Sequence, residues 1–124
     1  MKKLTASEEQ VMQIIWTLGK AFVKDIIAQY PQPQPPYNTI SSVVRILERK
    51  GFVSHKQYGN TYEYFPTVSR DSYKKFYLKD ALKNYFGNSF QQLVSFFAKE
   101  ENIDIGKLEE LLQKLKKEKS DQNG

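Results

Sequence analysis

Apolar residues recur at helical spacing near the start of the chain. They follow one another at the three- and four-residue intervals that place side chains on one face of an α-helix, as Val11, Ile14, Ile15 and Leu18. Residues 7–10, Ser-Glu-Glu-Gln, have the order of a capping box, in which the Ser7 hydroxyl accepts a hydrogen bond from the Gln10 amide. Gly19 follows the apolar run as a stop signal. The pattern therefore predicts a first helix that begins at Ser7 and ends before Gly19.

A short apolar run and then a run of prolines follow this first helix. Ala21 to Val23 can form a very short strand, after which Val23, Ile26 and Ile27 have the spacing of a second, shorter helix that ends before Pro31. Residues 31–36, Pro-Gln-Pro-Gln-Pro-Pro, cannot continue a helix, because proline lacks an amide donor and drives the preceding residue to extended geometry. We expect a stiff surface connection that acts as a spacer. A docking site for a proline-recognising domain is the alternative.

A third helix is expected from Asn38, as its cap, to Lys50, with Gly51 ending it. Its apolar residues recur at i, i+3, i+4 and i+7, as Ile40, Val43, Val44 and Leu47. On a helical wheel the opposite side is polar and cationic. It carries Asn38, Ser42, Arg45 and Arg49, with Thr39, Ser41 and Ile46 at its margins. The helix is therefore expected to bury one side and to present a polar face on the other.

Two segments rich in aromatic and β-branched residues come next, at positions 52–58 and 61–65. Gly59-Asn60 between them is a two-residue hairpin signal, and Pro66 ends the second strand because it cannot donate to a ladder. The predicted elements are thus three helices followed by a hairpin. This is the order of a winged helix-turn-helix, in which the third helix enters the major groove of DNA and the hairpin lies along the backbone.

The polar face of the third helix becomes a predicted DNA-binding surface in this fold. Short hydroxyl and amide side chains and arginine can read base edges, although such a face taken alone is equally typical of solvated surface. The residues expected to contact DNA are Asn38, Thr39, Ser41, Ser42, Arg45, Arg49, His55, Lys56, Gly59 and Asn60. We expect His55 to contact a phosphate or to be exposed rather than to bind a metal, because metal sites need several ligands.

From Ser69 the pattern is helical again, and it carries more large apolar residues than isolated helices could cover. Either these residues fold back on the winged domain or they form a two-fold dimer interface, which we favour because two-fold symmetry suits DNA with two half-sites. The expected interface residues are Phe90, Leu93, Val94, Phe97, Leu108, Leu111, Leu112 and Leu115. We therefore expect a mainly α fold with a small β-hairpin (α+β). Residues 1–68 would form a winged-helix domain, residues 69–119 a helical dimerisation region and residues 120–124 a disordered tail.

The amino-acid composition limits the kinds of function that the protein can have. The 124 residues carry a net charge of +5 and include one histidine and no cysteine. The basic balance favours a polyanionic partner, while the missing cysteine excludes disulfides and thiolate metal sites and fits the cytoplasm. We find no catalytic constellation, no metal site and no need for a cofactor. No charge-free stretch is long enough to insert into a membrane, and no signal peptide is recognisable.

Four segments resemble the penicillinase and methicillin-resistance repressors, a winged-helix family of bacteria. They run from Leu4-Thr5 to Trp16, from Tyr37-Asn38-Thr39-Ile40 to Leu47-Glu48-Arg49-Lys50-Gly51, from Tyr58 to Tyr64, and from Gln92-Leu93-Val94 to Phe97-Ala98-Lys99. The resemblance implies a homodimer that associates through its C-terminal helices and binds a double-stranded operator with the third helix and the wing. It also implies derepression of a resistance or stress operon when a membrane sensor with a zinc peptidase domain is activated.

The chain departs from this family at several places. Ile46 stands where the family often has arginine, and Arg45 precedes it, so the operator sequence is expected to differ. The cysteine cluster of copper-responsive members is missing. The segment in which β-lactam repressors are cut at an Asn-Phe bond reads Phe96-Phe97 here, which makes this pair the candidate cleavage site. A repressor induced by a small ligand, and a winged-helix interaction module without specific DNA binding, are the alternatives.

Overall fold

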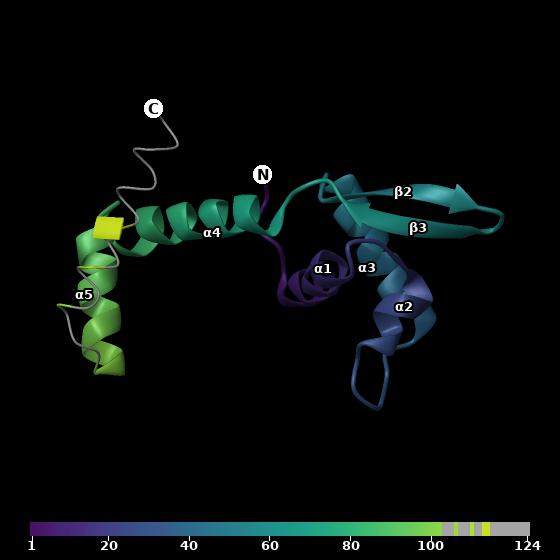
Figure 1. Cartoon of the computed structure of the whole chain (residues 1–124), viewed down its shortest axis with the longest axis horizontal. Helices are drawn as coiled ribbons and strands as arrows, with labels where there is room; N and C mark the ends of the chain where they lie inside the picture. Colours follow the sequence, from purple (N-terminus) through teal and green to yellow (C-terminus); the bar gives the residue numbers. More distant parts are fainter. Residues whose placement is uncertain (103–105, 107–109, 111–112, 115–124) are drawn as a thin grey trace. The chain divides into compact units, whose positions relative to one another are not determined.

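The computed structural model describes residues 1–102, 106, 110, 113 and 114, and it divides the chain into two compact units, Met1–Tyr77 and Leu78–Gly124. Figure 1 shows the elements in chain order. They are α1 (Ala6–Leu18), β1 (Ala21–Phe22), α2 (Val23–Ala28), α3 (Tyr37–Arg49), β2 (Val53–Tyr58), β3 (Thr61–Pro66), α4 (Arg70–Tyr85) and α5 (Phe90–Glu101). The expected mainly helical fold with a small β-hairpin is confirmed. None of the helices described is long and apolar enough to cross a membrane.

Helix α1 begins earlier than the sequence pattern predicts. Its cap is Thr5, whose hydroxyl accepts a hydrogen bond from the Glu8 amide at 3.3 Å, while the Glu8 carboxylate accepts one from the Thr5 amide at 3.1 Å. The prediction of a capping box at residues 7–10 was therefore wrong in its register. The observed box places Glu8 at the third helical position, from which its carboxylate also reaches a cation on another helix.

The expected short strand and second helix are confirmed, and the short strand joins the hairpin. β1, β3 and β2 form an antiparallel sheet in that order, with Ala21 opposite Tyr64 and Val53 opposite Pro66. The hairpin turn lies at Gly59-Asn60, where Gly59 has a φ of 60°. The proline-containing loop before α3 extends away from the helices (Figure 1). β1 thus attaches the start of α2 to the hairpin of β2 and β3, which is the predicted wing.

Helix α3 is capped by Pro36, so the prediction of Asn38 as its cap was wrong. Pro36 lies in an extended conformation, and its carbonyl accepts from the amides of Thr39 and Ile40 at 3.1 and 3.4 Å. Because the proline fixes its own φ near the value it has here, the helix can start at once after it. Asn38 therefore lies inside the first turn with its side chain exposed.

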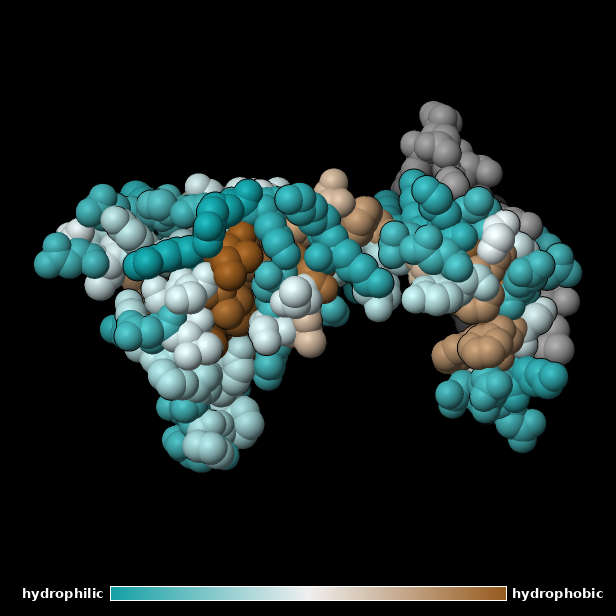
Figure 2. All heavy atoms as spheres, turned by 180° about the vertical axis from the view of Figure 1, so that it is seen from behind, coloured by the Kyte–Doolittle hydropathy of each residue, from teal (hydrophilic) through white to brown (hydrophobic). Residues whose placement is uncertain are grey.

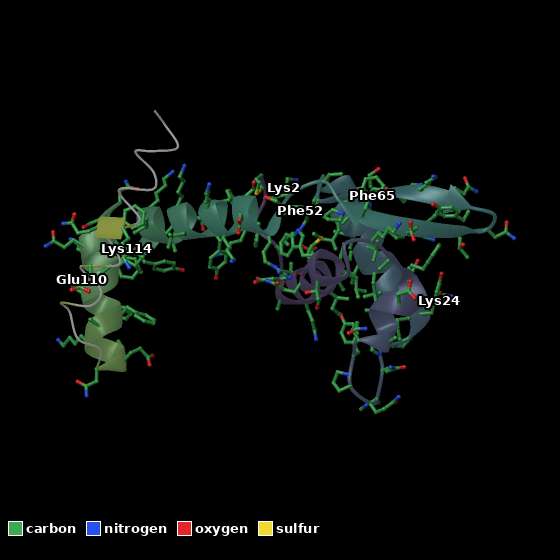
Figure 3. The ribbon with its side chains drawn as sticks, in the orientation of Figure 1. Lys2, Lys24, Phe52, Phe65, Glu110 and Lys114 are labelled. Carbon is green, nitrogen blue, oxygen red and sulfur yellow. The ribbon has the colours of Figure 1, made fainter. Side chains whose placement is uncertain are left out.

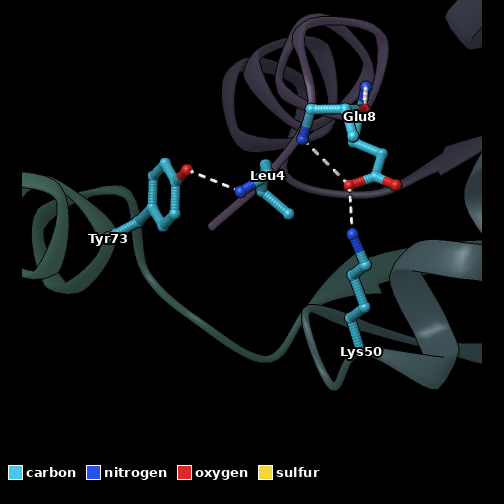
Figure 4. Close-up of polar contacts among 5 residues, drawn as sticks. Leu4, Glu8, Lys50 and Tyr73 are labelled. Atoms are coloured by element: carbon cyan, nitrogen blue, oxygen red, sulfur yellow. Dashed lines mark hydrogen bonds and ion pairs between the residues drawn. The ribbon is translucent and has the colours of Figure 1, made fainter. Parts of the chain in front are cut away.

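The core of the first unit lies between the three helices and the sheet. Its largest fully buried side chains are Phe52, Met12, Ile15, Ile26, Leu47, Val11 and Val44. The start of α4 belongs to this core, because the Tyr73 hydroxyl accepts a hydrogen bond from the Leu4 amide at 3.0 Å (Figure 4) and the Tyr73 ring packs on Phe52. Arg70 reinforces the attachment by donating to Gln13 and Thr17 of α1.

The second unit contains the end of α4 and α5. Ser89 caps α5 by accepting from the Gln92 amide at 3.2 Å, and the rings of Phe86 and Phe96 lie 5.7 Å apart. Among the described residues of this unit, Leu82 and Ala98 are the buried apolar side chains. The expected last helix, with Leu108, Leu111, Leu112 and Leu115, and the expected tail at 120–124 lie outside the described residues.

An ion pair between Glu8 and Lys50 joins the first turn of α1 to the end of α3 (Figure 4). Lys50 Nζ lies 2.6 Å from Glu8 Oε1, and the Glu8 side chain is almost fully buried. Burial alone raises the pKa of the Glu8 carboxyl, but the hydrogen bonds from Lys50 and Thr5 and the charge of Lys50 outweigh it. The pKa therefore lies below its ordinary value of 4.5. A lowered folded-state pKa stabilises the fold above the unfolded-state pKa, and this contribution disappears as the pH falls through the folded-state pKa.

Replacing Lys50 by methionine is expected to lower the free energy of unfolding at pH 7 by about 2–3 kcal/mol, because it leaves a buried carboxylate without its cation. The loss should be smaller at pH 3, because the contribution of the ion pair disappears as the pH falls through the folded-state pKa of Glu8. Urea unfolding at the two pH values checks this, with the exposed Lys20→Met as control. A loss that is the same at both pH values, or no greater than that of the control, would contradict the assigned pairing.

Candidate nucleic-acid interface

The outward face of α3 carries the polar residues that the helical wheel predicts there. Asn38, Thr39, Ser42, Arg45 and Arg49 are exposed, and Ser41 is half-buried at the margin. On the opposite side Ile40, Val44 and Leu47 are buried, each exposing 3% or less of its surface. The buried side fixes how α3 is rotated about its axis. It therefore fixes which side chains can meet a partner.

The wing contributes a second set of exposed residues from the same unit. Gly59 and Asn60 form its exposed tip, and Lys56 is exposed on β2 with its Nζ 5.3 Å from the centre of the Tyr58 ring. Because the Lys56 side chain is exposed, its ammonium is accessible to an anion from the side away from the ring. Lys56 is thus available to a polyanion.

His55 has a protein partner that the sequence did not reveal. Its Nδ1 lies 2.6 Å from Glu48 Oε2, and the centre of its ring lies 4.4 Å from that of the Tyr62 ring, with the two planes tilted by 38°. Because a carboxylate only accepts, Nδ1 must carry the hydrogen, and Nε2 is the ring nitrogen left for any further contact. The bond ties the wing to the last turn of α3. Glu48 and His55 come from different elements, so only the folded chain brings them together.

A groove of about 320 Å³ lies between the first turns of α3 and the wing. Its walls include three of the predicted DNA-contacting residues on α3, namely Asn38, Ser41 and Arg45, and also Asn60 at the wing tip. The other residues that line it are Phe22, Val23, Lys24, Tyr37, Thr61, Tyr62 and Tyr64, which the sequence analysis did not assign to a site. Tyr37 and Tyr62 expose 56% and 41% of their surface, so both side chains are accessible to a ligand in the groove.

The predicted dimerisation residues on α5 are largely uncovered within the second unit. Phe90 and Phe97 expose 44% and 50% of their surface, and Leu93 and Val94 are half-buried. Phe96, which belongs to the candidate cleavage pair, exposes 55%. Figure 2 shows apolar atoms at the surface of this unit, on the right of the view. No cluster of three or more His, Asp or Glu that could hold a metal ion occurs in the part of the chain that the structure describes.

The family to which the chain belongs follows from its sequence. Residues 4–117 match the family model described as penicillinase repressor. The chain belongs to this family. The methicillin resistance regulatory protein MecI of Staphylococcus aureus (strain N315) is 27% identical over 117 residues, which cover 93% of this chain and 94% of MecI. The penicillinase repressor of Staphylococcus aureus is 26% identical over 110 residues, which cover 88% of this chain and 87% of that repressor.

A solved structure supports the fold assignment. The solution structure of the DNA-binding domain of the repressor BlaI superposes with a TM-score of 0.50 at 25% identity, covering 59% of this chain and 94% of that domain. The winged-helix prediction is thereby confirmed. Membership of the family places the chain among DNA-binding transcriptional repressors rather than enzymes.

Proposed function

We propose that this chain is a homodimeric repressor that binds a specific operator with the outward face of α3 and the wing. One observation carries the proposal: α3 buries most of its apolar stripe and thereby presents Ser42, Arg45 and Arg49 to solvent beside the wing. A helix with short polar side chains and arginine on its outer face fits the major groove, which is wide enough to admit it.

The predicted DNA-contacting residues form two groups, according to the part of DNA that each can contact. Asn38, Thr39, Ser41, Ser42 and Arg45 lie in the first turns of α3 or shortly after them, where a recognition helix meets base edges. Arginine can donate two hydrogen bonds to guanine, so Arg45 is the principal candidate for base reading. Arg49, Lys56, His55 and the turn Gly59-Asn60 lie at the end of α3 and on the wing, where contacts to phosphate fix position without reading sequence.

We expect the second unit to form the dimer interface. Phe90 and Phe97 of α5 are exposed to solvent, and a second copy of the chain would bury this apolar surface. Two winged units in one dimer bind two half-sites, and their joint affinity rises through effective concentration. The proposed compartment is the cytoplasm, where such a repressor meets its operator.

The outward face of α3 yields a mutational prediction. Arg45→Ala and Ser42→Ala should each weaken binding to a duplex selected from a random library by the full chain, by about 1–3 kcal/mol for a lost base contact. Arg49→Ala should weaken selected and shuffled duplexes alike and reduce the slope of affinity against salt. Fluorescence anisotropy measures both effects, with the exposed Gln10→Ala on α1 as control. If all three variants bound DNA as tightly as the parent, the assignment of α3 as the recognition helix would be wrong.

The α5 surface predicts the oligomeric state. Sedimentation at micromolar concentration should give twice the chain mass of 14.5 kDa. Phe97→Asp should shift the protein towards monomer, because a charge in an apolar interface is not solvated. Gln91→Asp, an exposed position on the same helix, should leave the dimer intact. A parent chain that stays monomeric at high concentration would contradict the dimer.

Derepression is proposed to occur when the two copies of the repressor separate. The proposed cause is a cut at the Phe96-Phe97 bond by a membrane sensor peptidase during a resistance or stress response. Both side chains are exposed in the second unit, and a cut between them would divide α5 and so remove the proposed dimer surface. Mass spectrometry of the protein from cells induced with a β-lactam should then detect a fragment that ends at Phe96. Full-length chain alongside complete derepression would contradict cleavage and favour a small-molecule inducer.

A further inference from the structure

We propose that the groove between α3 and the wing holds the phosphate backbone of one DNA strand, and that Lys24 and Tyr37 contact this backbone. The proposal rests on the proposed function and extends it to residues outside the predicted DNA-contacting set. Neither residue lies on the outward face of α3 or at the wing tip. Lys24 comes from α2, and Tyr37 is the first residue of α3.

The groove is positively charged. Lys24 and Arg45 both line it, and none of its lining residues is acidic. Lys24 is exposed and projects from α2 (Figure 3). The neighbouring carboxylate of Asp25 is engaged elsewhere, since its Oδ2 accepts a hydrogen bond from the Phe22 amide at 2.9 Å. Two cations in a groove whose lining residues include no carboxylate attract a negatively charged ligand.

The other groups in the groove can donate hydrogen bonds to phosphate oxygens. Tyr37 and Tyr62 are the exposed aromatic residues on its two walls, and tyrosine hydroxyls are common donors to phosphate. Tyr64 lies at the base of the groove and is buried. Its burial, and then the charge of Glu48, raise the pKa of its hydroxyl, which keeps the proton that a donor needs.

The position of the groove beside the outward face of α3 indicates that DNA is its ligand. The groove shares Asn38, Ser41 and Arg45 with the outward face of α3, so a duplex seated on that face reaches the groove. In a winged helix the third helix enters the major groove and the hairpin lies along the backbone, so we expect one sugar-phosphate strand at the groove between these two elements. Contacts of this kind set the register of the protein on DNA but carry no sequence information.

The test compares Lys24→Gln with Lys20→Gln, an exposed lysine that does not line the groove. The full chain is titrated at several salt concentrations against the selected duplex and against a shuffled duplex of the same length. Lys24→Gln should weaken both duplexes by the same factor, about 3- to 10-fold, and lower the salt slope by about 0.9 for one phosphate lost. Tyr37→Phe should weaken both duplexes without changing the slope, because it removes a donor and no charge. Lys20→Gln should bind like the parent.

Three outcomes would overturn the proposal. The groove does not hold the backbone if Lys24→Gln and Lys20→Gln have the same affinity and salt slope. The contact is to a base if the loss occurs only with the selected duplex. If the parent chain binds neither duplex, the proposed function fails together with this inference, whereas the first two outcomes leave it standing.

Discussion

The burial of one apolar stripe on α3 is the constraint on which the rest of the site depends. Ile40, Val44 and Leu47 are almost wholly buried, and removing the side chain of a leucine in such a place costs about 2–5 kcal/mol. Turning the helix by one residue would rotate it by about 100° and expose part of this stripe. The rotation of α3 is therefore fixed, and the polar residues opposite the stripe are held outward by packing on the other side.

Polar contacts then hold the neighbouring elements to this helix. Lys50 at its C-terminal end binds Glu8 of α1, Glu48 in its last turn binds His55 of the wing, and β1 pairs with the wing strand β3. The proposed DNA-binding surface is thus built from elements that are each tied to α3 or to the sheet. The wing and the recognition helix can meet a duplex as one preorganised surface, which lowers the entropy lost on binding.

Much of this could be predicted from the sequence, for reasons that are local. The periodicity of Ile40, Val43, Val44 and Leu47 predicts both the helix and its polar face, and Gly59-Asn60 predicts the turn. Helix starts were harder, because Thr5-x-x-Glu8 and Ser7-x-x-Gln10 both have the order of a capping box, and the ion pair with Lys50 adds a tertiary contact to the first of them. The groove and the Glu48–His55 bond depend on tertiary structure, since their residues come from separate elements.

Site-directed photocrosslinking tests the central claim most directly, because the chain has no cysteine and one introduced thiol carries the only label. Ser42→Cys on the outward face of α3 and Gln10→Cys on α1, both exposed positions, would each be coupled to a photoactivatable group and irradiated with the selected duplex. The account predicts crosslinks to DNA from position 42 and none from position 10. Crosslinks from position 10 without any from position 42 would contradict it.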